Sequence, residues 1–282
     1  MIDYDNVIPM STAQIKFSLV GAIHFPPLPG YAEFPGFDVA IKNARADLIS
    51  FQNGGADAII FENNYDVPHT EFVKPEIVSA MTRIIESVKN DIKIPFGISV
   101  LWNDYRAALD IALATGGVFI RVPVFVDTVK TQYGIVKGNP SEVIAYRNKI
   151  GAQHIKIYTD IHVKHSEILS PLSLEQSALS ARDNGSDALI ITGKWTGIAP
   201  DFEKLQQVRS AVGDFPIFCG SGVDINNIKK LQSVSDGAIV STSLKEETEK
   251  DETNVKAYSA RINQGAVKAI VGAVKMRMTS DK

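Results

Sequence analysis

The sequence lacks several features that mark whole classes of protein. Its single cysteine, Cys219, excludes an internal disulfide framework and a zinc site built from cysteines. Its apolar runs are short and broken by glycine, proline or charge, so none is long enough to span a bilayer. The first fifteen residues include Asp3 and Asp5 and lack the basic start and apolar core of a signal peptide. These absences predict a cytoplasmic protein without a transmembrane segment.

The chain also has no excess of basic charge. Twenty-nine Lys and Arg residues stand against 32 Asp and Glu residues, which gives a net charge of −3. Binding to nucleic acid usually demands a basic stripe, so we expect no nucleic-acid partner. The 282 residues are 45% hydrophobic and 22% charged, as in a globular protein. That length fits either two modest domains or one large α/β barrel.

Short apolar runs alternate along the chain with amphipathic stretches of helical period. Eight runs are predicted as strands: Ser18–His24, Asp57–Asn63, Ile94–Val100, Gly117–Val122, His154–Ile161, Asp187–Gly193, Pro216–Gly220 and Gly237–Thr242. That number predicts an α/β fold, a single (β/α)8 TIM barrel over residues 1–282, whose usual size is about 250 residues. Two segments stand outside the alternation, a Pro-rich loop at 25–37 and a charged loop at 245–254.

Helix signals fill the intervals between the strands. Helices are predicted over Pro75–Asn90, with proline at its first position, and over Asp104–Thr115, which stops at a glycine pair. Ser173 and Gln176 form a capping-box pattern before a third helix. Asp224 is a candidate cap for a helix over Ile225–Val234.

The fifth predicted strand carries an unusual pattern of charge. Alternation places Lys156, Tyr158 and Asp160 on one face and isoleucines on the other, so Lys156 should point into the barrel. A buried ammonium is costly unless it is paired, and such a lysine can form a Schiff base, carry a proton or anchor phosphate. The alternative is a structural ion pair with Asp160 or Glu62. His162 has the same parity and is a further candidate for the pocket.

Polar residues gather where the predicted strands end, which is the catalytic end of this fold. Glu62 follows four apolar residues and is a candidate general base or metal ligand, with His24, Asp160 and His162 as further ligands. No dense zinc motif occurs, so a divalent metal is neither required nor excluded, and no cofactor is assigned. The other candidates at this end are Asn63, Asp66, His69, Asn103, Asp104, Arg121, Lys164 and His165.

The last strands end in small and hydroxyl-bearing residues. Loops after strands 7 and 8, with a helix N-terminus, form the recurrent phosphate site of this fold. The candidate phosphate ligands are Thr192, Gly193, Lys194, Gly220, Ser221, Gly222, Ser241 and Thr242. The alternative is that small residues here only make tight turns.

Several motifs together resemble the BtpA family. They include Gly21-Ala22-Ile23-His24 with Pro27-Leu28-Pro29-Gly30, Gly55–Asn63 with Asp66 and Pro68, Asp160–His165, and Gly220-Ser221-Gly222-Val223. The resemblance runs in the family's order from about His24 to Arg261. It implies a barrel of the ribulose-phosphate-binding type. It also implies either an enzyme on sugar phosphates or nucleosides or a factor for photosystem I biogenesis.

We therefore expect an enzyme that acts on a small phosphorylated sugar or nucleoside-like molecule. Isomerisation, aldol-type cleavage and nucleosidase-like cleavage of a glycosidic bond all fit the residues. The alternative is a non-catalytic assembly or stability factor. The oligomeric state stays open, a homo-oligomer included.

Overall fold

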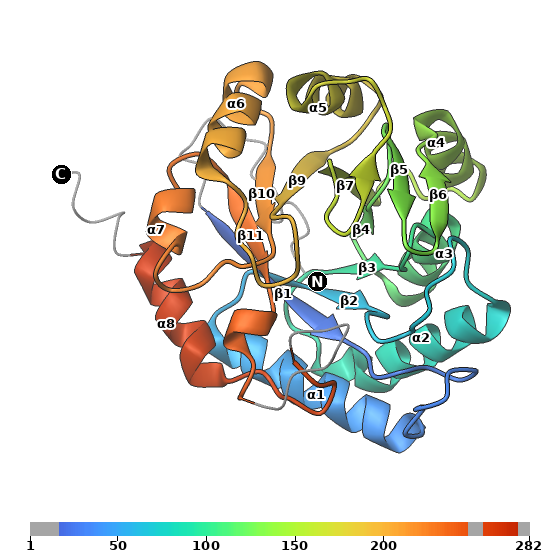
Figure 1. Cartoon of the computed structure of the whole chain (residues 1–282). Coiled ribbons are helices and arrows are strands. Elements are labelled where there is room, and N and C mark those ends of the chain that lie inside the picture. Colours follow the sequence, from blue (N-terminus) through green and yellow to red (C-terminus); the bar gives the residue numbers. More distant parts are fainter. Residues whose placement is uncertain (1–16, 248–255, 276–282) are drawn as a thin grey trace.

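The computed structural model describes residues 17–247 and 256–275. Eight parallel strands close into a barrel in the order β1-β11-β10-β9-β7-β4-β3-β2 (Figure 1). They are β1 (Ser18–His24), β2 (Ala58–Glu62), β3 (Phe96–Ser99), β4 (Phe119–Val122), β7 (Lys156–Ile161), β9 (Ala188–Thr192), β10 (Ile217–Gly220) and β11 (Gly237–Val240). Each lies within the strand predicted from the sequence, and the TIM-barrel prediction is confirmed.

Helices surround this barrel in the part of the chain that is described. They are α1 (Phe37–Gly54), α2 (Pro75–Val88), α3 (Tyr105–Thr115), α4 (Pro140–Lys149), α5 (Leu174–Asp183), α6 (Phe202–Val212), α7 (Ile228–Leu231) and α8 (Gln264–Lys275), with 3-10 turns η2 (Lys89–Asp91) and η3 (Thr242–Leu244). The Ser173–Gln176 capping box is present, and Asp104 caps α3. Within residues 17–247 and 256–275, no helix combines the length and apolarity needed to cross a membrane.

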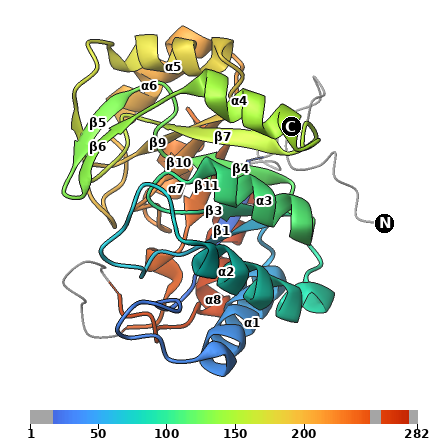
Figure 2. The same cartoon turned by 90° about the vertical axis from the view of Figure 1, so that its right-hand side faces the viewer.

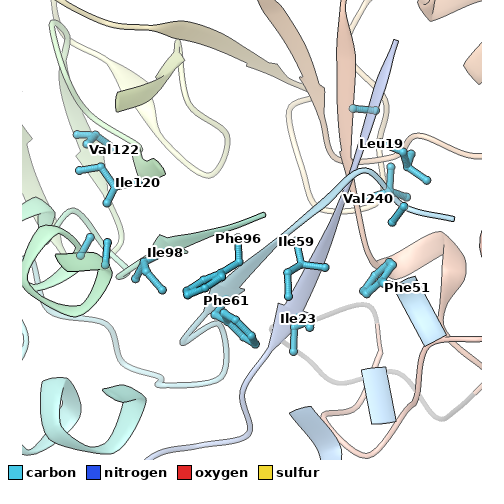
Figure 3. Packing of buried hydrophobic residues seen from close by; sticks show 14 of the residues in the cluster. Leu19, Ile23, Phe51, Ile59, Phe61, Phe96, Ile98, Ile120, Val122 and Val240 are labelled. Atoms are coloured by element: carbon cyan, nitrogen blue, oxygen red, sulfur yellow. The ribbon is translucent and has the colours of Figure 1, made fainter. Parts of the chain in front are cut away.

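Side chains of the strands alternate between two cores. Val20, Ile60 and Tyr158 belong to the cluster inside the barrel. Ile23 and Ile59 belong to the larger cluster between strands and helices, where Phe51 of α1 packs (Figure 3). The alternation matters for the site, because a residue two positions beyond an interior residue faces the barrel axis one layer higher.

A small second sheet stands on the end of the barrel where the strands finish (Figure 2). It has the order β6-β5-β8 and consists of β5 (Thr128–Thr131), β6 (Gly134–Lys137) and β8 (Glu167–Ile168). Its strands belong to the loops after β4 and β7, and Trp102 packs beneath it with Val129 and Val136. This sheet was not predicted from the sequence.

Two local predictions need correction or fall partly outside the described residues. The helix predicted over Ile225–Val234 is only the four residues of α7, because the Asp224 carboxylate accepts hydrogen bonds from the Asn226 and Asn227 N–H groups and forms a turn there. The predicted charged loop at 245–254 is described only as far as Glu247.

Candidate active site

Four ionisable side chains form a layer at the carboxyl ends of the strands. His24, Glu62, Arg121 and Asp160 each come two residues after an interior core residue, so all four face the barrel axis. β1 pairs with β2 and β4 pairs with β7, and β3 separates the two pairs; His24 pairs in register with Glu62. The fold thus brings together candidates that are far apart in the sequence.

Arg121 is the centre of this layer. Its Nε and Nη2 donate to the two Asp160 carboxylate oxygens at 2.8 Å each, and its Nη1 donates to Glu62 Oε1 at 3.0 Å. The arginine is 9% exposed, Glu62 4% and Asp160 1%. Bidentate pairing of this kind is strong and fixes the geometry of both partners. Two carboxylates therefore hold one guanidinium rigidly inside the barrel mouth.

The surroundings of Glu62 and His24 set the charge states of these two groups. Burial by itself raises the pKa of Glu62, but Arg121 and His24 outweigh it and lower that pKa to about 2. Burial lowers the pKa of His24 to about 4, and the Glu62 carboxylate, with Oε2 3.4 Å from His24 Nε2, offsets this only in part. Near neutral pH the layer therefore contains a carboxylate beside a neutral imidazole.

Lys164 reaches this layer from the loop after β7. Its Nζ donates to Thr196 Oγ1 at 3.1 Å and to Ser221 Oγ at 2.9 Å. Burial and the nearby Arg121 charge lower the pKa of Lys164 to about 8. An amine with a pKa near 8 exchanges protons easily at physiological pH, which suits acid–base or nucleophilic chemistry.

Two cavities open on this end of the barrel, and Lys164 lines both of them. The serine chamber, about 270 Å³, is lined by Gly220, Ser221, Gly222, Ser241 and Thr242, among others. The aromatic chamber, about 290 Å³, is lined by His69, Trp102, Tyr133, His165 and Trp195, among others. Glu62, Asn64, Arg121, Lys164 and Thr196 line both chambers.

The serine chamber has groups suited to an anion. Ser241 is 7% exposed, and its Oγ has no hydrogen-bond partner among the described residues. Gly222 has a φ of 58°, and a Cβ there would lie 2.0 Å from the Ala199 nitrogen, so only glycine admits the loop that covers it. Lys245 and Lys256 also line this chamber, on the side of the last strand.

A profile of the BtpA family matches residues 15–274. The chain belongs to the BtpA family. The photosystem I biogenesis protein BtpA of Synechocystis is 36% identical over 83% of this chain and 82% of its own length. A relative from Pyrococcus horikoshii is 39% identical over 81% and 87%, and the sgc region protein SgcQ of Escherichia coli is 33% identical over 82% and 87%.

Solved structures of other barrels share the fold of this BtpA family member. A structure described as native KDPGal aligns with a TM-score of 0.57 at 15% identity, over 94% of this chain and 98% of that one. The geranylgeranylglyceryl phosphate synthase of Thermoplasma acidophilum, solved with its substrate sn-glycerol-1-phosphate, aligns with a TM-score of 0.57 at 13% identity, over 92% and 94%. At these identities the likeness concerns the fold alone.

Lys156 does not lie in the site of this BtpA family member, and this corrects its predicted place. Its parity is as expected, but it is the first residue of β7, about 13 Å below Asp160 at 3.3 Å per residue. Its ammonium is half-exposed at the opposite mouth of the barrel and lies 3.1 Å from the Asp187 carboxylate. The lysine that lines both chambers is Lys164, at the other end of the barrel.

His162 also points elsewhere. The strand ends at Ile161, and a φ of 49° at His162 breaks the alternation. Its Nε2 lies 3.5 Å from Ser177 Oγ of α5, and it lines neither chamber. Lys164, two residues further on, lines both chambers.

Three predicted phosphate ligands, Thr192, Gly193 and Lys194, do not line the serine chamber. Thr192 Oγ1 accepts a hydrogen bond from the Lys164 N–H at 3.1 Å, so it positions that loop. Gly193 packs against the Ile198 carbonyl, and Lys194 is exposed. The helix N-terminus expected beside the glycines is missing as well, since α7 begins only at Ile228.

Four of the remaining candidates hold loops together. Asn63 accepts from the Leu101 N–H at 2.7 Å and donates to Asp66 at 3.1 Å. Asn103 makes two hydrogen bonds with the Val124 backbone, at 2.8 and 2.9 Å. Asp66 accepts from the Leu28 N–H, and Asp104 accepts from the Ala107 and Val73 N–H groups. His69 and His165, in contrast, line the aromatic chamber.

Several residues that line the chambers were not predicted from the sequence as candidate ligands. Lys245 and Lys256 lie beyond the last strand, while Trp102, Tyr133 and Trp195 belong to loops. Lys245 is 7% exposed and donates to Tyr65 Oη at 3.2 Å. An alternating run with a glycine turn at 128–137 was the one signal for the hairpin that carries Tyr133. Among residues 17–247 and 256–275, no three His, Cys, Asp or Glu side chains gather as a metal site.

Proposed function

We propose that this protein is an enzyme that acts on a small phosphorylated sugar or nucleoside-like substrate. The observation that carries the proposal is Lys164, whose ammonium is hydrogen-bonded to the neutral hydroxyls of Thr196 and Ser221 where the two chambers meet. Arg121 is already neutralised by two carboxylates, and Lys256 is paired with Glu247. Lys164, together with Lys245 on the other side of the serine chamber, supplies the positive charge that a phosphate there would require.

The same lysine is placed to react with the bound molecule. In its neutral form Nζ can accept a proton from a carbon next to a carbonyl, or attack the carbonyl carbon and release its oxygen as water. Glu62 and the neutral His24 face the same space and provide a second acceptor and relay for protons. Isomerase and aldolase chemistry both fit this pair of groups, and cleavage of a glycosidic bond fits proton donation by Lys164.

Thermal shift with a panel of phosphorylated compounds tests the proposal, because a ligand that binds only the folded state raises its melting temperature. We expect ribose 5-phosphate or a nucleoside monophosphate to protect the wild type and not Lys164→Met. Lys194→Met is the matched control, since Lys194 is exposed and lines neither chamber. Absence of protection by every phosphorylated compound would refute the proposal.

Two further measurements define the role of Lys164. Borohydride reduction during turnover would leave a stable adduct on Lys164 if an imine forms, and none if the lysine only transfers protons. The affinity for a phosphorylated ligand should also fall as the pH rises above about 8, because Lys164 then loses its proton. A flat profile up to about pH 9.5 would remove Lys164 from phosphate binding.

The relative named for photosystem I biogenesis supports a second candidate, a non-catalytic assembly factor. Complementation of a deletion strain separates the two. Full rescue by Lys164→Met supports the assembly factor, whereas rescue by Lys194→Met alone supports the enzyme.

A further inference from the structure

The aromatic chamber has a lining unlike that of the serine chamber. It presents five rings, and they come from five different loops: His69, Trp102, Tyr133, His165 and Trp195. His69 meets Tyr133 edge-on with ring centroids 5.5 Å apart, and His165 meets Trp195 at 5.1 Å and 61°. The chamber is therefore walled by aromatic surface on several sides.

These rings carry no charge near neutral pH. Burial lowers the pKa of both His69 and His165 to about 4, and the neighbouring Lys164 adds to this for His165. The charged residues of the site, Glu62, Arg121 and Lys164, lie where the two chambers meet. A neutral aromatic wall favours a flat apolar ring over a second phosphate or a polyhydroxyl chain.

Trp195 is unusually exposed for a large aromatic residue. It is 50% exposed, although it lines the cavity. A large, half-exposed ring that lines a cavity is suited to stack a base, and such stacking contributes about 1–3 kcal/mol per base. Because both chambers share Lys164 and Thr196, one molecule can extend from the serine chamber into the aromatic chamber.

We propose that the substrate is a phosphomonoester that carries a planar heteroaromatic ring, of the nucleoside monophosphate kind. Its phosphate lies in the serine chamber at Ser221 and Ser241, its sugar lies beside Lys164, and its ring lies in the aromatic chamber against Trp195. This rests on the proposed function and narrows it from phosphorylated compounds in general to those with a base.

The chain supplies its own probe for this proposal. It has two tryptophans, Trp102 and Trp195, and both line the aromatic chamber. Tryptophan fluorescence therefore reports on this chamber directly. We would titrate the full chain with adenosine and uridine 5′-monophosphates, ribose 5-phosphate and inorganic phosphate, and measure affinities by calorimetry in parallel.

We expect at least one of the two nucleotides to quench the fluorescence and to bind roughly tenfold or more tightly than ribose 5-phosphate. Trp195→Ala should weaken nucleotide binding about 5- to 150-fold and leave ribose 5-phosphate within about twofold. Trp195→Phe should restore most of the loss, because a ring is retained. Ser221→Ala should weaken both ligands, and an unchanged melting temperature of the Trp195 variants would show that they fold.

Two outcomes overturn the proposal, and they differ. If ribose 5-phosphate binds as tightly as both nucleotides and Trp195→Ala changes neither affinity, the ring is not recognised, while the proposed function stands. If no phosphorylated ligand binds or protects the wild type, the proposed function fails and this inference fails with it.

Discussion

Replacing Arg121 with methionine tests whether the charged layer is a structural unit. The substitution removes three charge-assisted hydrogen bonds at once, two to Asp160 and one to Glu62. Both carboxylates then lack their cation while they remain 1% and 4% exposed. Breaking a buried ion pair by removing one partner costs about 3–5 kcal/mol, because the other charge stays desolvated. We expect Arg121→Met to lower the free energy of unfolding by about that amount at about pH 7.5.

The loss should depend on pH in a defined direction. In the wild type the pKa of Glu62 lies at about 2, below its ordinary value, so its contribution is fully present above about pH 4.5 and disappears as the pH falls toward 2. Without Arg121, burial makes this carboxyl bind a proton more readily when folded than when unfolded. The variant therefore regains stability as the pH falls from about 7.5 to about 5, and its deficit narrows.

Urea unfolding at these two pH values measures the effect, and two further variants control it. Arg45→Met removes an ion pair of similar length, 2.8 Å, whose partners are both 43% exposed, and should cost at most about 1 kcal/mol. Adding Glu62→Gln and Asp160→Asn to Arg121→Met removes the orphaned charges and should recover much of the loss. If Arg121→Met costs no more than Arg45→Met, or if the triple variant is no better than the single one, the reasoning is wrong.

Three further substitutions, one of them with a matched control, test two loops and the position of Lys156. Gly222→Ala should weaken binding of a phosphorylated ligand by roughly ten- to a hundredfold, because the new Cβ displaces the covering loop. Gly116→Ala, also at positive φ but in open space, should cost stability alone, and calorimetry with thermal melts compares the two. Asn103→Ala should destabilise the protein by about 2–4 kcal/mol in urea, since both polar groups of Val124 lose a buried partner. Lys156→Ala should leave ligand affinity unchanged and cost at most about 1 kcal/mol, and a lost affinity would reinstate it in the site.

The barrel was predictable because its signal is local and repeated. Strands buried on both faces read as continuous apolar runs, as in Ala58–Phe61 and Ala188–Ile191. Period-2 alternation then fixes which strand residues face the axis, and a residue such as Glu62 at the end of its strand must lie in the site. Predicting the inward-facing residues of the site requires only the position where each strand ends, and the sequence indicates this position by the end of each apolar run.

The loop residues were less predictable, because their positions depend on single backbone angles and on distant contacts. The positive φ at His162 turns this side chain away from the barrel axis, so parity counted onward from Asp160 fails at His162. Lys156 itself was misplaced because parity gives the face of a strand and not the height along it. Tyr133 and Trp195 contact histidines of other loops, and these contacts depend on the tertiary fold, which local sequence patterns do not describe.

The arrangement divides the work of the site between strands and loops. Arg121 has its charge balanced by two strand carboxylates, Asp160 on β7 and Glu62 on β2, so it adds rigidity and little attraction for an anion. Lys164 is the opposite case, since its partners are neutral hydroxyls and its charge is available to a ligand. Substitutions on the strands should therefore lower stability first, and substitutions of Lys164 should lower affinity first. If strand substitutions lowered the affinity and Lys164 substitutions lowered only the stability, the ligand would bind through the strand residues. The loops would then only cover the site.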